Sequence, residues 1–544
     1  MRSFLALAAL VGTALMTATP TLADVKSSLY PENWVPGFAD AQGRFLHDFS
    51  YAGYHKSEIP LPVPQGQTFD VTKAPYNADN TGNADVTAAI QQALDAAANA
   101  GGGIVYLPEG TYKLTFIDPK HDYAIRLHSS NTVLKGDGLK KTHLYLDETV
   151  SRQKAVVLMR PDAPPWWFNK NGEGTLITQD LTKPTLTLPM SDVKGFTPGQ
   201  LVVVRSDFTQ GFIDDVKMTG KWLPTSNMRG ITLLRRVVSV DPANSTLTID
   251  APTRYPMKTR DALRVYPLAD ANMRESALEG FSIAMKQNPK PGLEEEAYSK
   301  EGTAGYDVHM SSAVTISGAE DCWARDIGTY NPPGNPPNID IHSHGLRLLY
   351  SRQVTITNCD FRNAEYHGGG GNGYLYTFSS NDCLIRDSIA VNGRHNFDFQ
   401  NMWCIGNVAF HNTIRDGSLP SDYHMFLSTG NLVDNMTVDH DMLECRYRPY
   451  AKPLHGESGS QNVFWNTNGL SYSAKHHYVV DSRQFGIGYV IGTRGPANAV
   501  NTQTDDFIDC VGQGDELNPQ SLWIDQLNRR TGEKKCGDAR LAEP

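Results

Sequence analysis

Acidic, basic, histidine and tyrosine side chains are concentrated between residues 365 and 457 of this chain. Four histidines recur there at nearly even intervals, namely His367, His395, His424 and His455. Such side chains move protons and stabilise negative charge in active sites. This stretch is therefore the candidate site, and its regular spacing calls for an explanation in the fold.

A short aliphatic or β-branched patch returns through the same region every 24 to 31 residues, at Val354–Ile356, Leu384–Ile385, Val408–Ala409, Leu432–Val433 and Val463–Phe464. This period, with some longer loops, is typical of the stacked coils of a parallel β-helix. Equivalent positions on successive coils lie about 4.8 Å apart, the spacing of neighbouring strands. Groups one repeat apart in sequence are therefore expected to meet in space.

The candidate residues fall into two sets, and both are expected to line one groove. The catalytic candidates are His395, His424, His455, Arg446, Asp398, Asp441 and Glu444. The substrate-binding candidates are His367, Tyr366, Tyr374, Tyr376, Asp422, Tyr423, Arg448, Tyr450, Lys452 and Glu457. His342 and His344 lie on another predicted coil and stay outside both sets.

Residues 76–114 carry the clearest local pattern. A helix is expected after Asp85, because apolar residues recur on one face at Ala89, Ile90, Ala93, Leu94 and Ala97. Three glycines at 101–103 end it, and a strand at 104–107 follows. Such a helix would cover the open apolar end of a solenoid.

This segment resembles the N-terminal cap and first coil of the pectate-lyase-like right-handed parallel β-helix superfamily. The resemblance rests on Asp79, Gly82, Asp85, Thr87, Ala89, Ile90, Ala93, Leu94, Gly101, Gly102, Gly103, Val105, Leu107, Pro108, Gly110, Thr111 and Tyr112. It implies an all-β solenoid with a capping helix. It also implies a carbohydrate-active protein: a lyase, hydrolase, epimerase, fructan-converting enzyme or phage tailspike. The C-terminal half matches no catalytic signature, so no family catalytic residue is carried over.

The expected organisation begins with a signal peptide at 1–23 and an extended segment at 24–68. The cap and first coils follow at 69–149, then an inserted antiparallel β subdomain at 150–270. The main β-helix with the groove occupies 271–500, and a C-terminal segment with a packed helix occupies 501–544. At Trp166 and Trp167, a packed junction with the insert is favoured over a sugar-stacking platform.

Composition narrows the class of protein further. The formal net charge of −10 argues against nucleic acid as a partner. The predicted signal peptide at 1–23 leads us to expect an exported protein, secreted or periplasmic. After it, no run reaches about 20 apolar residues, so no membrane span is expected. None of the seven cysteines has CxxC spacing, so no zinc site is expected. Two interpretations of the cysteines stay undecided: Cys510 and Cys536 could form a disulfide, and Cys359 and Cys383 could be buried as small core residues. The oligomeric state is not indicated.

Two sugar-cleaving chemistries fit these residue types. In β-elimination from a uronic acid, Arg446, Arg448 and Lys452, or a bound cation such as Ca²⁺, would neutralise the carboxylate while another side chain removes the C5 proton. In hydrolysis, or glycan and fructan transfer, an Asp/Glu pair would flank the bond. The lyase is favoured because the groove combines histidine and tyrosine with several cations. A non-catalytic, glycan-binding surface β-helix is the second alternative.

Overall fold

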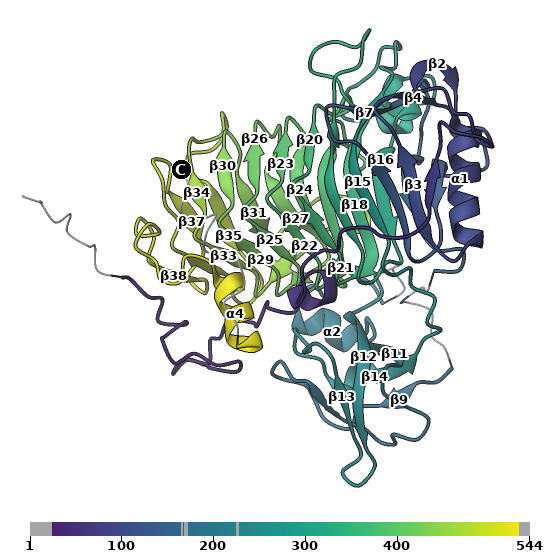
Figure 1. Ribbon diagram of the computed structural model, residues 1–544. Coiled ribbons are helices and arrows are strands. Elements are labelled where there is room, and N and C mark those ends of the chain that lie inside the picture. The colour runs from purple at the N-terminus through teal and green to yellow at the C-terminus, as the bar shows by residue number, and fades with distance from the viewer. Residues whose placement is uncertain (1–23, 165–166, 168–171, 225–227, 533–544) are drawn as a thin grey trace, which may run out of the picture.

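The computed structural model describes residues 24–532 except 165–166, 168–171 and 225–227 (Figure 1). The chain forms a parallel β-helix with a capping helix and an antiparallel insert, so the predicted fold class is confirmed. The predicted signal peptide and Cys536 lie outside the described residues. No helix among the described residues is both long and apolar enough to cross a membrane.

Two parallel sheets form the walls of the solenoid. The larger has 20 strands: β1 (Thr68–Asp70), β2 (Thr81–Asp85), β3 (Gly103–Leu107), β4 (Gly110–Leu114), β6 (Thr132–Gly136), β7 (Thr142–Leu146), β15 (Ala277–Met285), β17 (Trp323–Thr329), β19 (Thr355–Thr357), β20 (Asp360–Arg362), β22 (Leu384–Arg386), β23 (Ile389–Val391), β25 (Val408–Phe410), β26 (Thr413–Arg415), β29 (Leu432–Asp434), β30 (Thr437–Asp439), β33 (Val463–Trp465), β34 (Asn468–Gly469), β36 (Tyr489–Ile491) and β38 (Phe507–Asp509).

The second sheet carries the candidate site. Its ten strands are β5 (Tyr123–Leu127), β8 (Ala155–Met159), β16 (Ser312–Ser317), β18 (His344–Arg352), β21 (Tyr374–Asn381), β24 (His395–Gln400), β27 (Ser421–Met425), β31 (Leu443–Arg446), β35 (Val480–Arg483) and β37 (Val500–Thr502). A two-stranded pair, β28 (Ser428–Thr429) and β32 (Gly459–Ser460), lies beside it.

Stacked aromatic rings hold the strands of this second sheet in register. Tyr376 stacks on Phe397 with ring centroids 4.8 Å apart, and Phe399 stacks on Tyr423 at 4.4 Å. These rings lie in the main hydrophobic core. Because side chains alternate along a strand, the residues between these inward rings face outward.

Asparagine side chains also connect successive coils. The Asn407 backbone N–H donates to the Asn431 side-chain oxygen at 3.0 Å, and the Asn431 N–H donates to Asn462 in the same way at 3.0 Å. All three asparagines are fully buried. This ladder satisfies backbone groups at the turns and keeps the coils aligned.

The N-terminal end of the solenoid is closed by α1 (Thr87–Asn99), as the sequence pattern predicts. Ile90, Ala93, Leu94 and Ala97 are buried in the main core. The Asp85 carboxylate accepts from the Thr87 backbone N–H at 3.0 Å, which supplies a hydrogen bond at the helix start.

The insert is a six-stranded antiparallel sheet with its own core. Its strands are β9 (Thr175–Leu176), β10 (Thr187–Pro189), β11 (Leu201–Arg205), β12 (Thr232–Asp241), β13 (Thr246–Ile249) and β14 (Arg264–Pro267), and α2 (Gln210–Asp215) packs with them. The buried Trp167 packs with Leu201 and Val203 of β11, which fits the predicted junction. Trp166 lies outside the described residues.

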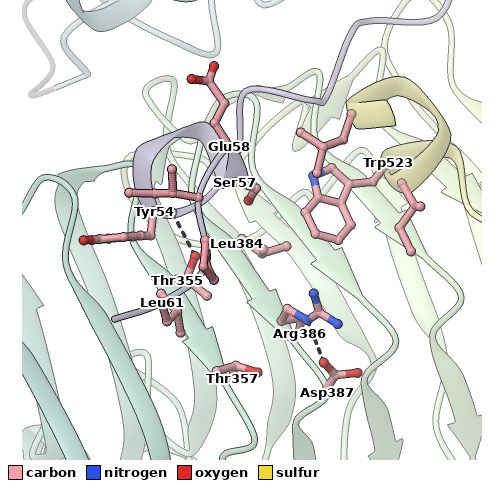
Figure 2. A pocket seen from close by; sticks show the side chains of 14 residues that line it. Tyr54, Ser57, Glu58, Leu61, Thr355, Thr357, Leu384, Arg386, Asp387 and Trp523 are labelled. Atoms are coloured by element: carbon pink, nitrogen blue, oxygen red, sulfur yellow. Dashed lines mark hydrogen bonds and ion pairs between the residues drawn. The ribbon is translucent and has the colours of Figure 1, made fainter. Parts of the chain in front are cut away.

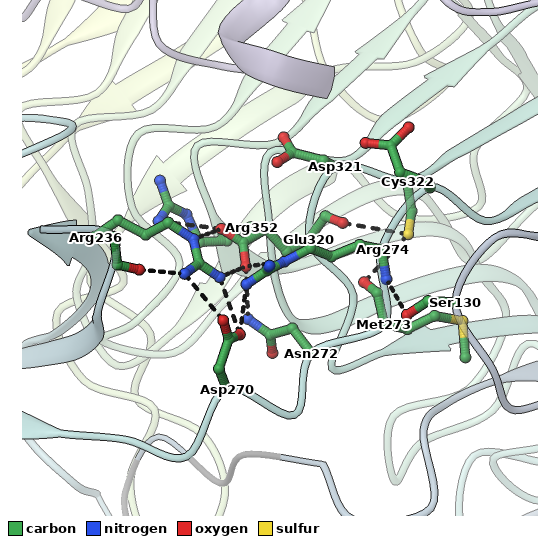
Figure 3. Close-up of polar contacts among 12 residues, drawn as sticks. Ser130, Arg236, Asp270, Asn272, Met273, Arg274, Glu320, Asp321, Cys322 and Arg352 are labelled. Atoms are coloured by element: carbon green, nitrogen blue, oxygen red, sulfur yellow. Dashed lines mark hydrogen bonds and ion pairs between the residues drawn. The ribbon is translucent and has the colours of Figure 1, made fainter. Parts of the chain in front are cut away.

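A charged network fastens the insert to the solenoid (Figure 3). The Glu320 residue is only 1% exposed. Its carboxylate forms ion pairs with the guanidinium groups of Arg236 of β12, at 2.5 Å, and of Arg274, at 3.2 Å. Asp270 bridges the same two arginines. Removing one member would leave a buried charge without its partner, so the network resists displacement of the insert.

The predicted segment boundaries need two corrections. β8, inside the stretch assigned to the insert, pairs in parallel with β5 and β16 and belongs to the solenoid. Its five buried residues form an unbroken apolar run, whose periodicity does not distinguish a solenoid strand from an insert strand. β38 pairs with β36, so the solenoid also extends beyond residue 500.

The N-terminal segment and α4 (Leu522–Thr531) cover the outer face of the 20-stranded sheet, where Tyr30, Trp34 and Phe49 pack with Trp523 and Leu527. The remaining helices are short: α3 (Ala304–Asp307) and the 3₁₀ turns Tyr54–Ser57, Thr259–Asp261 and Ala297–Ser299. The second sheet is left with a different, polar outer face.

Candidate functional site

A ladder of outward side chains runs across the second sheet, one residue per strand. The aligned positions are Arg347, Thr377, Asp398, Asp422, Glu444 and Asp481. Each alternates with inward residues such as Leu346 and Leu348 of β18. Neighbours in the ladder are about 4.8 Å apart, so four carboxyl groups follow one another on consecutive coils.

Arginines at one end of these strands balance the carboxylates. Arg448 Nη1 lies 2.6 Å from Asp422 Oδ2 and 2.7 Å from Glu444 Oε1. Arg446 pairs with Glu444 at 2.8 Å, and Arg483 pairs with Asp481 at 2.6 Å. The ionised carboxylates at this end therefore already have cationic partners.

A row of aromatic rings lies beside the ladder. It runs from His344 through Tyr374, His395 and His424 to His455, with successive ring centroids 5.2, 4.8, 5.3 and 4.7 Å apart. His344, Tyr374 and His395 are at most 2% exposed, and His424 is 7% exposed. Five successive coils thus contribute one ring each to a nearly dry surface.

Asp422, His424 and Tyr374 form a hydrogen-bonded chain. His424 Nδ1 lies 3.1 Å from the Asp422 carboxylate, which only accepts, so Nδ1 carries the proton. His424 Nε2 then accepts from the Tyr374 hydroxyl at 3.2 Å. Burial raises the pKa of Tyr374, so the phenol keeps its proton until a reaction demands it.

His395 has the opposite arrangement, with one nitrogen held and the other without a partner. Its Nδ1 donates to the Pro420 carbonyl at 2.5 Å, which leaves Nε2 as the acceptor nitrogen. Nε2 is buried and has no hydrogen-bond partner among the described residues. Burial lowers the pKa of His395 to about 3, so the ring is neutral and able to take a proton near neutral pH.

The two central carboxyl groups differ in charge. Burial, reinforced by the nearby Asp422 charge, raises the pKa of Asp398 well above its usual range. Burial also opposes ionisation of Asp422, but Arg448 and the two imidazoles outweigh it and hold the pKa of Asp422 well below its usual range. Asp398 therefore holds its proton much more strongly than Asp422, and such a split between neighbours is typical of catalytic pairs.

Unpartnered buried polar atoms gather on the same surface. They include His344 Nδ1 and Nε2, Arg347 Nε, Thr377 Oγ1, His395 Nε2 and Asp398 Oδ1. Neither a hydrogen bond nor an ion pair is seen for the Arg347 side chain within the described part of the chain. Native interiors satisfy nearly all such groups, so this cluster of donors and acceptors could bind a polar ligand.

The same surface offers one group of potential metal ligands. Ligand atoms of His395, Asp422 and His424 lie within 4.8 Å of one another. Two imidazoles and one carboxylate do not suit Ca²⁺, which takes six to eight oxygen ligands. The Arg448 guanidinium also occupies the Asp422 oxygen that a cation would share. The expectation of Ca²⁺ thus finds no fitting ligand set in this group.

A hairpin between β31 and β32 covers the far end of the row. Arg448 and Gly456 pair through two backbone hydrogen bonds of 2.8 and 3.0 Å. Trp222 of the insert donates to the Leu454 carbonyl at 2.7 Å and packs against Gly456. The insert therefore positions the hairpin that carries His455.

Of two cavities in the described structure, one adjoins the row of rings and the other lies on a different sheet. A cavity of about 340 Å³ is lined by His455, Phe426 and Lys452 and adjoins the ring row. A larger one, about 420 Å³, lies on the outer face of the 20-stranded sheet between Tyr54, Arg386 and Trp523 (Figure 2). The larger cavity is thus remote from the histidine row.

Many sequence-predicted residues do come together. The ladder, the row of rings and their arginines include the predicted residues Asp398, Asp422, Glu444, Arg446, Arg448, Tyr374, His395, His424 and His455. Lys452, Tyr450 and Glu457 lie on or beside the covering hairpin, where Tyr450 is 49% exposed and burial raises the pKa of Glu457.

Other predicted residues lie elsewhere. Tyr376 and Tyr423 point into the core, because strand alternation places them on the inner face. The Tyr366 hydroxyl donates to the Glu294 carbonyl beneath a loop, and His367 bonds to Ser418 at 2.9 Å instead of joining the row. The expectation that these four line the groove is wrong.

Asp441 is also outside the groove. It is 1% exposed, accepts from Asn396 at 2.7 Å, and borders a cavity of about 260 Å³ before β31. Burial raises the pKa of Asp441 to about 7. A turn position before the strand, not a ladder position, explains its absence from the site.

Sequence reasoning missed Arg347, Thr377 and His344. One signal was available: Arg347 is a charged residue between Leu346 and Leu348, where alternation makes it the outward member of a strand. His344 replaces the missing His367 at the start of the row, because the loop before β21 takes His367 away from the sheet.

Comparison with known proteins agrees with this fold. Residues 71–183, about a fifth of the chain, match the family model described as Rhamnogalacturonase A/epimerase, pectate lyase-like. The resemblance to the pectate-lyase-like β-helix superfamily is thereby confirmed. The matched residues include the capping helix and the first coils, and they end before β18 and the candidate site.

Two curated relatives share a short stretch. Alginate lyase 7 of Azotobacter vinelandii is 42% identical over 71 residues, 13% of this chain and 8% of that protein. Mannuronan C5-epimerase AlgE3 of the same organism is 43% identical over 67 residues, 12% of this chain and 4% of that protein. The chain thus spans less than a tenth of the length of either relative.

Among solved structures, a tailspike of Acinetobacter baumannii bacteriophage AP22, in complex with a capsular saccharide, has a TM-score of 0.44 and 11% identity. The match covers 79% of this chain and 66% of the tailspike. The A-module of Azotobacter vinelandii mannuronan C-5 epimerase AlgE4 has a TM-score of 0.26 and 12% identity, covering 82% and 96%. These likenesses concern the β-helical course of the chain alone.

Proposed function

We propose that this protein is an exported polysaccharide lyase that cleaves a uronic-acid-containing glycan by β-elimination. The observation that carries the proposal is the half-buried Arg347 guanidinium, for which the described part of the chain shows no ion pair. Its electrostatic neighbours include Asp398 and Tyr374, and the Tyr374 ring lies 4.8 Å from the ring of the neutral base His395. The match to a pectate-lyase-like family and the short stretches shared with an alginate lyase and mannuronan epimerases support a uronate substrate.

The Arg347 guanidinium would bind the uronate carboxylate. A half-buried cation without an ion pair is partly desolvated, so an arriving carboxylate offsets that cost. Pairing also withdraws charge from the carboxylate, which makes the neighbouring C5 proton more acidic. Thr377, next in the ladder, offers an unpartnered hydroxyl to the same group.

His395 and Tyr374 would divide the proton transfers. His395 Nε2 takes the C5 proton, and the C5–H electron pair forms the C4–C5 double bond. The C4–O4 bond breaks, and the Tyr374 hydroxyl protonates the leaving oxygen. Because the two rings lie 4.8 Å apart, the extra proton on His395 can return to Tyr374 and reset the pair.

The Asp422–His424 pair positions Tyr374. His424 Nε2 accepts from the tyrosine hydroxyl, and Asp422 keeps the imidazole in the required tautomer. Arg448 holds Asp422 ionised through its 2.6 Å contact. This arrangement follows the general logic by which a third group orients a base beside a reactive hydroxyl.

A panel of uronate glycans tests the proposal. Incubation should generate the ultraviolet absorbance of an unsaturated uronate together with new reducing ends. His395→Gln and Tyr374→Phe should lose this activity, while His128→Gln and Tyr123→Phe, on an earlier coil, should retain it. Reducing ends without unsaturation would contradict β-elimination.

Hydrolysis is the second candidate, favoured by one observation. Asp398 and Asp422 lie opposite each other on neighbouring strands, with the pKa of Asp398 raised and the pKa of Asp422 lowered. Carboxyl groups about 5 Å apart suit a retaining hydrolase or transferase. Reducing ends that vanish in Asp398→Asn, with no unsaturated product from the wild type, would support this alternative.

The non-catalytic alternative predicts glycan binding without turnover. Alanine variants of His395, His424 and His455 would then bind glycan as the wild type does. The exported location rests on residues 1–23 of the sequence. Cell fractionation of the full-length chain, with amino-terminal sequencing of the recovered protein, tests it.

A further inference from the structure

We propose that the cavity beside His455 is a second sugar subsite, which holds the anionic residue adjoining the one that reacts. This inference rests on the proposed function and adds a specificity role for the insert. The cavity has a volume of about 340 Å³, within the size range of small-molecule sites. Its walls come from four separate segments of the chain.

The insert contributes Met228 and Arg229 to one wall. The turn after β24 contributes Asn401, Met402 and Trp403, and the end of β27 contributes Met425 and Phe426. The covering hairpin supplies Ala451, Lys452, Pro453 and His455. The cavity therefore exists only because the insert and the hairpin meet over the second sheet.

This cavity adjoins the reaction surface through His455. The His455 ring lies 4.7 Å from the His424 ring and 6.1 Å from the Phe426 ring. The Phe426 backbone N–H donates to the His455 carbonyl at 3.2 Å. A glycan whose reacting residue occupies the His395–Tyr374 surface can thus extend past His424 into the cavity.

The side chains that line the cavity complement both the charge and the apolar face of an acidic sugar. Arg229 and Lys452 supply positive charge, while Met228, Met402, Met425 and Phe426 supply apolar surface for the C–H face of a pyranose. His455 Nδ1 is buried, has no hydrogen-bond partner in the described part of the chain, and can bond to a sugar hydroxyl. A charged group and a sugar face can both be accommodated.

Trp403 gives this subsite a rigid aromatic wall. Its Nε1 donates to Ser379 at 2.9 Å, and its ring stacks on Tyr350 with centroids 5.7 Å apart and planes at 27°. A ring fixed on two sides loses little entropy when a sugar packs against it. Trp403 also packs in the insert junction, so its replacement would disturb folding and is avoided in the test.

The test compares Lys452→Glu with the wild type on uronate oligosaccharides of increasing length. Lys452 is exposed on the hairpin, so its reversal leaves the core intact. For the shortest oligomer that is cleaved, kcat/KM should stay within about twofold. For longer oligomers it should fall about tenfold, mainly through a higher KM, because an interaction worth about 1.4 kcal/mol is lost.

Lys194→Glu is the matched control, because Lys194 is an exposed lysine on the insert away from the cavity. It should leave the rates unchanged at every length. An equal loss at all lengths in Lys452→Glu, or no loss at any length, overturns the subsite.

Failure of the proposed function gives a different result. If the wild type forms no unsaturated product from any uronate glycan, calorimetric binding of a uronate oligomer decides the subsite separately. About tenfold weaker binding by Lys452→Glu than by the wild type supports it. Equal affinity, or no binding by the wild type, overturns it.

Discussion

Asp398 and Asp422 face each other on neighbouring parallel strands, yet the pKa of the first carboxyl is raised and the pKa of the second is lowered. The difference arises from Arg448, which contacts Asp422 at 2.6 Å, whereas Asp398 accepts from the Gln400 amide at 2.5 Å and forms no ion pair within the described residues. Two chemically identical groups one coil apart thus acquire different roles. Their surroundings, with the histidine row beside them, underlie the following predictions.

Replacing Arg347 with Met should separate activity from stability. We expect kcat/KM on a uronate glycan to fall at least about 100-fold, because the carboxylate loses its cation. The free energy of unfolding should stay equal or rise slightly, because a half-buried charge without an ion pair is removed. Steady-state kinetics and denaturant unfolding measure the two effects.

Arg126→Met is the control for that experiment. Arg126 occupies the same outward column on β5 and pairs with Asp162 at 2.8 Å. It should leave kcat/KM unchanged. Full activity in Arg347→Met would remove the central argument for a uronate substrate.

His395→Gln should lower kcat by about 10²–10⁴-fold, the usual contribution of a general base. Gln keeps a polar group of similar size but cannot accept the proton. Tyr374→Phe should produce a comparable loss, with the fold retained by circular dichroism. Substantial activity in both variants would be incompatible with these two residues sharing the proton transfers.

The acid limb of the pH–activity profile should lie well below pH 6.5. Burial lowers the pKa of His395 to about 3, so the base remains neutral in mildly acidic solution. We expect kcat/KM at about pH 5 to stay close to its neutral value. An inflection near pH 6.5 that disappears in His395→Gln would show that the base titrates normally.

The lowered pKa of His395 also predicts that the free energy of unfolding depends on pH. Between about pH 6.5 and about pH 3, His395 is protonated in the unfolded chain but neutral in the native state. The native state therefore loses stability as the pH falls through this range. Relative to His395→Gln, the wild-type free energy of unfolding should decline by up to about 1.4 kcal/mol per pH unit in that window. Denaturant titrations of both proteins at several pH values measure this difference.

Removing Arg448 should be strongly destabilising. Arg448→Met leaves Asp422 and Glu444 buried without their shared guanidinium, so we expect a loss of about 3–5 kcal/mol. Adding Asp422→Asn should recover part of this loss. Arg446→Met, at a more exposed position, should cost less. Additive losses in the Arg448 and Asp422 double variant would argue against direct coupling.

Chelation should leave activity unchanged. The His395–Asp422–His424 group supplies too few oxygen ligands for Ca²⁺, and Arg448 already occupies Asp422. Dialysis against a chelator, followed by assay with and without added Ca²⁺, tests this expectation. Restoration of lost activity by Ca²⁺ would reveal a cation site among other residues.

The sequence by itself determined the architecture and the region of the site. The apolar face of the helix at 87–99, the glycines after it and the recurring aliphatic patches are local patterns, and each predicts its element without distant contacts. Coil spacing then places His395, His424 and their carboxylates on neighbouring strands. Strand spacing does not depend on which loop joins the coils, so this inference succeeded.

Only the tertiary structure decided which side chains face the site. Tyr376 and Tyr423 differ from Thr377 and Asp422 by one position, and that single step reverses the face of the sheet. Loops of unequal length displaced His367 and brought Tyr374 and His344 into the ring row. The cavity beside His455 depends on the insert meeting the hairpin, a contact between Trp222 and Leu454 that no local pattern encodes.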